Sequence, residues 1–66
     1  MWMLVIHDSR GRFVECTKVV SVVRGDDFLE VHPDGEIPPH YRKQIPLKKN
    51  WEYVLRSPIG EGISLC

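Results

Sequence analysis

The sequence contains no alanine, although valine occurs eight times and isoleucine five times. Alanine favours helices more than any other residue, whereas β-branched side chains lose rotamer freedom in a helix and pack well on a pleated sheet. This selection of apolar residues therefore predicts strands rather than helices. We expect an all-β fold that is mainly antiparallel.

Long hydrophobic runs and cysteines are also scarce. The apolar run near the start covers residues 2–6, with no basic segment before it, and is too short for a signal peptide or a membrane span. Two cysteines, Cys16 and Cys66, are fewer than the disulfide framework of a small secreted domain needs. We expect a cytoplasmic protein with reduced thiols and no membrane partner.

The chain has only 66 residues and no net charge. A chain of this size buries only about 60 % of its unfolded surface, so we expect one small β domain over residues 1–66. Balanced charge does not favour nucleic-acid binding, yet the charges are segregated. Residues 26–36 contain five acids and no Lys or Arg, whereas residues 42–56 contain five bases and one acid. We expect these two segments to lie near each other and to neutralise one another.

Hydrophobic alternation and turn residues predict the strands. Residues 2–7 form a strand that is apolar on both faces, with Leu4 and Ile6 on one side and Met3 and Val5 on the other. Gly- and Asp-containing turns separate this segment from the later ones. The further strands are expected at residues 12–24, 28–32 and 51–56, and residues 63–66 are either a short closing strand or a frayed tail.

The second segment loses its period of two at the valine doublets. A phase slip near residues 17–20 would act as a β-bulge and bend the strand so that it serves two parts of a sheet. Residues 36–41 are extended because Pro38 and Pro39 exclude a helix. Residues 41–44 allow at most one helical turn, and residues 45–47 are better interpreted as an edge segment. These features predict a small SH3-like barrel or a curled sheet of four to five strands.

One stretch is similar to a known family. Residues 22–35 place an acid-tipped turn between two β-rich segments, and this resembles the hairpin of LytTR-type DNA-binding domains. The resemblance covers 14 residues, and the prolines that follow depart from the family. It therefore assigns no functional residue.

The residue types of catalysis and metal binding are present without the necessary spacing. His7, Asp8 and Ser9 are contiguous, so they cannot form a hydrolase triad, and turn capping by Asp8 or Ser9 is the better interpretation. A thiol and base pair could come only from Cys16 and His7. No two of the candidate metal ligands show zinc-site spacing. We expect no enzyme, metal or cofactor; the candidate ligands are His7, His32, His40, Cys16 and Cys66.

The most suggestive segment mixes bases with aromatic residues. Such a mixture is found on single-stranded nucleic-acid surfaces and equally in protein-binding hot spots. Alternatively, Trp51, Tyr53 and Leu55 face the core, which leaves the bases without a stacking platform. The candidate binding residues are Tyr41, Arg42, Lys43, Lys48, Lys49, Trp51 and Arg56.

Two functions remain open at this stage. The first is a non-catalytic binding module that docks on a larger protein and modulates it, as small accessory proteins of phages and mobile elements do; segregated charges suit guided docking. The alternative is a nucleic-acid-binding small β-barrel that uses residues 40–56. Because a core this small is marginal alone, a second copy of the chain is a further candidate partner.

Overall fold

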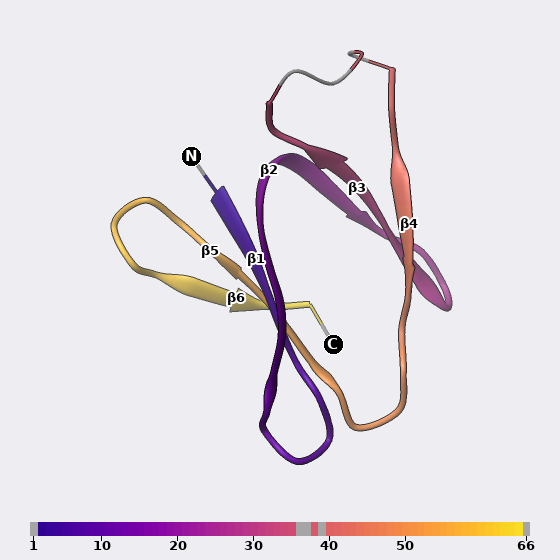
Figure 1. Ribbon diagram of the computed structural model, residues 1–66, viewed down its shortest axis with the longest axis vertical. Coiled ribbons are helices and arrows are strands. Elements are labelled where there is room, and N and C mark those ends of the chain that lie inside the picture. Colours follow the sequence, from indigo (N-terminus) through magenta and orange to yellow (C-terminus); the bar gives the residue numbers. More distant parts are fainter. Residues whose placement is uncertain (1, 36–37, 39, 66) are drawn as a thin grey trace.

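The structure is a computed structural model that describes residues 2–35, 38 and 40–65. These residues form one antiparallel sheet with the strand order β4-β3-β2-β1-β5-β6 (Figure 1). They contain no helix, and hence none that could cross a membrane. The all-β, antiparallel prediction is confirmed. The strands are β1 (Trp2–His7), β2 (Phe13–Arg24), β3 (Phe28–Pro33), β4 (Lys43–Pro46), β5 (Glu52–Arg56) and β6 (Gly62–Ser64).

The sheet has six strands, which is more than the four or five expected. β6 is the short closing strand that was one of two predictions for the end of the chain. β4 is an edge strand instead of a helical turn, since Lys43 and Ile45 pair with Val31 and Leu29 of β3. Pro46 ends β4, at an edge position where its missing N–H costs no ladder bond. The extended geometry expected for residues 36–41 falls partly on Glu36, Ile37 and Pro39, which lie outside the described residues, as does Cys66.

The long strand β2 bends where the sequence loses its alternation. Its first residues pair with β1, ending at Val19 opposite Trp2, and its last residues pair with β3. The register shifts between Val19 and Ser21, so that Val20 is an additional residue in the ladder. The predicted bulge is therefore confirmed at Val20. Figure 1 shows the result: β1, β5 and β6 lie to one side of β2, and β3 and β4 lie to the other.

The core lies between these two parts of the sheet. Alternation places Leu4 and Ile6 of β1 on the inner face, where they share rows with Leu55 and Tyr53 of β5. The side chains of β3 approach from the other part. Six hydrophobic residues are buried: Leu4, Ile6, Val19, Leu29, Val31 and Tyr53. Leu47 and Trp51 are among the half-buried residues that pack against them.

Long side chains connect β4 to the strands that face it across the core. The Tyr53 hydroxyl donates to the Pro46 carbonyl (3.0 Å) and accepts from the Lys48 N–H (2.9 Å). At the other end of β4, Lys43 Nζ lies 3.7 Å from Glu15 Oε1 of β2. Among the described residues, β4 and β6 are the unpaired ends of the sheet, so its closure into an SH3-like barrel stays a prediction.

Replacing Tyr53 with Phe tests this connection. Tyr53→Phe keeps the ring in the core but leaves the Lys48 N–H and the Pro46 carbonyl without their shared partner. We expect the free energy of unfolding in urea to fall by about 1–3 kcal/mol. Tyr41→Phe is the control because Tyr41 is exposed, and it should change stability by less than about 0.5 kcal/mol. Equal effects of the two substitutions would contradict the assignment.

Candidate functional site

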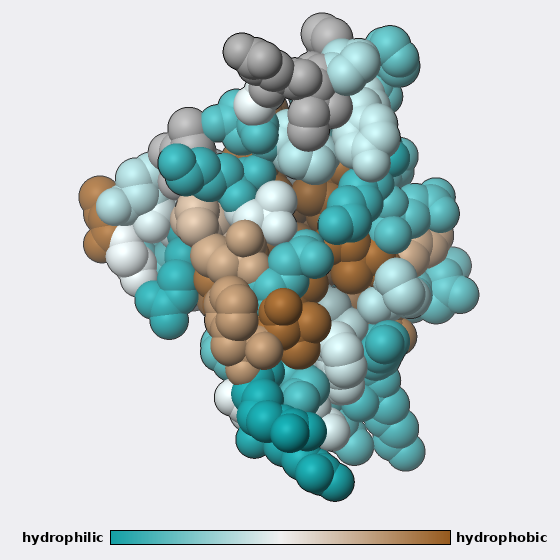
Figure 2. Space-filling model, in the orientation of Figure 1, coloured by the Kyte–Doolittle hydropathy of each residue, from teal (hydrophilic) through white to brown (hydrophobic). Residues whose placement is uncertain are grey.

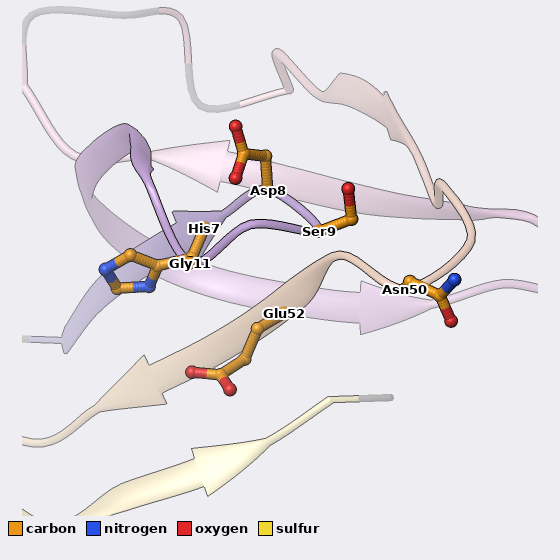
Figure 3. A pocket seen from close by; sticks show the side chains of 6 residues that line it. All are labelled: His7, Asp8, Ser9, Gly11, Asn50 and Glu52. Atoms are coloured by element: carbon orange, nitrogen blue, oxygen red, sulfur yellow. The ribbon is translucent and has the colours of Figure 1, made fainter.

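A cleft of about 340 Å³ lies beside the turn between β1 and β2. One wall comes from this turn and the other from the start of β5 and the residue two positions before it. Gly11 and Asn50 both have left-handed backbone geometry, with φ values of 78° and 66°. Its lining residues are His7, Asp8, Ser9, Gly11, Asn50 and Glu52 (Figure 3).

Asp8 closes the turn, and both of its carboxylate oxygens are engaged by groups of the turn itself. Its Oδ1 accepts hydrogen bonds from the N–H groups of Arg10 and Arg12, each at 2.9 Å, and its Oδ2 lies 3.3 Å from Arg12 Nε. The hydrogen bond from the Arg12 N–H is the largest cause that lowers the pKa of the Asp8 carboxyl. Desolvation is the next largest effect and opposes it, and the Arg10 N–H and the Arg12 charge lower the pKa further. Turn capping, expected from the sequence, is confirmed for Asp8.

The other polar side chains of the cleft do not converge on a reaction centre. Figure 3 shows His7 and Glu52 directed away from Asp8 and Ser9. His7 and Glu52 are cross-strand partners, and the His7 ring meets the Phe13 ring edge-on at 6.2 Å between centroids. His7 Nδ1 is buried, and no residue within the described part of the chain forms a hydrogen bond with it. Among the six described residues that line the cleft, the imidazole is therefore not directed at the Ser9 hydroxyl.

The remaining chemical candidates are also separated. Cys16 is exposed and pairs with Val5, whereas His7 pairs with Phe13, so the thiol and the imidazole are not opposite each other. In the part of the chain that the structure describes, no three His, Cys, Asp or Glu residues gather where they could hold a metal ion.

The seven candidate binding residues lie at three places in the fold. Tyr41 and Arg42 precede β4 and Lys43 opens it, whereas Lys48, Lys49 and Trp51 follow its other end (Figure 1). Arg56 ends β5 and pairs with Met3. The Arg42 guanidinium donates to the Tyr41 carbonyl, and Lys43 contacts Glu15. The extended backbone of β4 separates residues that are close in the sequence.

The acidic and basic segments do lie side by side, because β3 pairs with β4. The Leu47 N–H donates to the Asp27 carbonyl at 2.9 Å, which places the residue after β4 against the acidic loop. The sequence predicts that bases of residues 42–56 pair with acids of residues 26–36. Lys43 departs from this prediction, because its carboxylate partner is Glu15 of β2.

Residues 48–51 form a turn, called here the 48–51 turn, that is fixed by a hydrogen bond to the core residue Tyr53. The Lys48 N–H donates to the Tyr53 hydroxyl, and the Trp51 N–H donates to the Lys48 carbonyl at 3.3 Å. Lys48 Nζ lies 4.5 Å from the centroid of the Trp51 ring, within cation–π range. Trp51 is half-buried against the core, while Lys48, Lys49 and Asn50 are exposed. The turn therefore presents an ordered cation–aromatic pair.

A second surface, which sequence analysis did not select, is the outer face of β1, β2 and β5. It carries exposed Phe13 and Cys16 and half-buried Met3, Val5 and Val54. Figure 2 shows hydrophobic atoms over β1 and the first part of β2, with hydrophilic atoms around them. The signal in the sequence was the apolar character of both faces of residues 2–7.

The lowered pKa of Asp8 predicts an acid-dependent loss of stability. A depressed carboxyl pKa contributes stability above its ordinary value, and this contribution disappears as the pH falls through the lowered value. Asp8→Asn keeps an oxygen for both N–H groups but does not titrate. We expect the difference in unfolding free energy between wild type and Asp8→Asn to shrink from about pH 5 to about pH 2 in denaturant titrations. A difference that grows on acidification would contradict this assignment.

Comparison with family models, with curated proteins and with solved structures finds no match to this chain.

Proposed function

We propose that the protein is a non-catalytic binding module that docks on a larger protein through the 48–51 turn and modulates it. The observation that carries this proposal is the position of the two aromatic residues. Tyr53 is 1 % exposed and supports the turn from within, and Trp51 is half-buried beside Lys48. A fixed aromatic side chain with flanking cations is typical of the anchor residues of protein interfaces.

The same positions disfavour nucleic acid as the ligand. Single-strand binding needs exposed ring faces on which successive bases stack, along a groove of positive charge. Tyr53 offers no exposed ring, and Lys48 lies over the Trp51 ring. Lys43 and Arg56 lie away from the turn, at the start of β4 and the end of β5, so they do not extend its charge into a track.

The chemistry of the turn also indicates what the partner presents. Lys48 and Lys49 are exposed cations, and a rim charge acts mainly on the rate and specificity of association. The proposed partner surface is therefore acidic, with an apolar position that contacts the exposed part of Trp51. We propose a regulatory or inhibitory role for such docking, in the cytoplasm, where the free thiol of Cys16 would stay reduced.

We also infer that the scaffold is a small SH3-like barrel. The support for this inference is the bend of β2 at Val20, together with the contacts of Tyr53 and Lys43 that hold β4 against the opposite strands. Two parts of a bent sheet that pack face to face enclose a core, and they do so without hydrogen bonds between the strands of the two parts.

Charge reversal of the turn tests the proposed function. The immobilised wild type should retain a protein partner from a nuclease-treated lysate, and Lys48→Glu/Lys49→Glu should abolish this retention. The two introduced carboxylates would repel the acidic surface of the partner. The matched control is Arg10→Glu/Arg24→Glu, which makes the same change in net charge at two exposed positions outside the turn. The control should retain the partner at the wild-type level.

Two outcomes would contradict the proposal. The first is retention of the same partners by both double variants. The second is binding of the wild type to a labelled single-stranded oligonucleotide at moderate salt, lost only in Lys48→Glu/Lys49→Glu. Such binding would establish the nucleic-acid alternative, because phosphate contacts give affinity that falls steeply with salt.

A further inference from the structure

The outer face of β1, β2 and β5 is exposed to solvent, yet the residues in its centre are apolar. Its middle row joins three side chains across the strands: Cys16 of β2, Val5 of β1 and Val54 of β5. Cross-strand partners share one face, so these three side chains are neighbours. No described element packs over them, since every strand belongs to the same sheet and the core lies on its other side.

The two flanking rows carry charges of opposite sign. One row contains Lys18, Met3 and Arg56, and the other contains Phe13, His7 and Glu52. Along the strand direction, a basic row is therefore followed by an apolar row and then by an acidic row. Arg56 and Glu52 are four residues apart on β5, which is about 13 Å and too far for an ion pair within one chain. Neither has an ion-pair partner among the described residues.

We propose that a second copy of the chain covers this face in an isologous, two-fold dimer. A two-fold axis that lies along the middle row reverses the strand direction and places the basic row of one copy over the acidic row of the other. Arg56 then faces Glu52 of the second copy, and Lys18 faces its Phe13, which is 64 % exposed in one chain. The two apolar middle rows meet at the centre.

The charge pattern also excludes the competing arrangement. A two-fold axis along the strands would superpose the basic row on itself, so that Lys18 of one copy would face Arg56 of the other. Like charges opposite each other are unfavourable across an interface, and here the clash would occur twice. The pattern of this one face therefore selects both the partner and its orientation.

The size of the face predicts a weak dimer. Three strands and five residues per strand span about 10 by 17 Å of backbone, below the roughly 800 Å² per partner of standard interfaces. We therefore expect a weak, reversible dimer with a dissociation constant on the order of 100 μM. Burial of the apolar row would add to the stability of a small core.

Charge exchange on β5 tests the orientation. Sedimentation equilibrium from about 1 μM to about 1 mM should show a monomer–dimer equilibrium for the wild type. Arg56→Glu and Glu52→Arg should each raise the dissociation constant at least tenfold, because each creates two like-charge contacts per dimer. The double variant Arg56→Glu/Glu52→Arg should restore dimerisation. The control Arg24→Glu, at the end of β2 outside this face, should have no effect.

Cys16 supplies an independent measure of the geometry. Packed sheets lie about 10 Å apart, so the two Cys16 thiols would face each other across the axis, within reach of a short bis-maleimide reagent. In a Cys66→Ser background, wild type and the double β5 variant should form a cross-linked dimer, and Arg56→Glu should not.

Several results would overturn the proposed dimer. These are a monomer throughout the concentration range, single variants that dimerise normally, a double variant that does not recover, and cross-linking that is insensitive to Arg56→Glu. The outcome is independent of the proposed function, because none of these residues belongs to the 48–51 turn.

Discussion

The hydroxyl group of Tyr53 is the contact on which the rest of this structure depends. Its ring fills the core, and its oxygen satisfies one donor and one acceptor of the β4–β5 connection. A buried hydroxyl without partners would be costly, and so would the Lys48 N–H if the phenol were missing. One side chain thus closes the core and fixes the 48–51 turn, so that folding and the proposed docking surface share a cause.

The bulge at Val20 explains how so short a chain encloses a core at all. A straight β2 would give a flat sheet with both faces exposed to solvent. The additional residue Val20 bends β2 and turns the last part of this strand, which pairs with β3, away from the part that pairs with β1. This bend makes one face of the sheet concave and buried. The opposite face of β1, β2 and β5 then stays outside and carries the apolar residues Met3, Val5 and Val54. The two proposed surfaces are consequences of this division.

Much of this could be predicted from the sequence because the signals were local. The lack of alanine predicted the fold class, the alternation in residues 2–7 predicted that Leu4 and Ile6 share a face, and the slip near Val20 predicted the bend. The relation between distant segments could not be predicted. Residues 40–56 suggested one binding segment of basic and aromatic residues, but the extended strand β4 separates Lys43 from Lys48, and only the fold decides this. The outer face had one signal in the sequence, the apolar character of both faces of residues 2–7, but its rows come from three strands whose pairing the sequence does not specify.

The most direct test of the central claim is amide hydrogen exchange of the 48–51 turn by NMR. If the Tyr53 hydroxyl holds the turn, the Lys48 N–H should exchange slowly, like the N–H groups of the central strands, although its side chain is exposed. The neighbouring Lys49 N–H, which has no hydrogen-bond partner among the described residues, should exchange rapidly. Equal and rapid exchange at Lys48 and Lys49 would contradict the account.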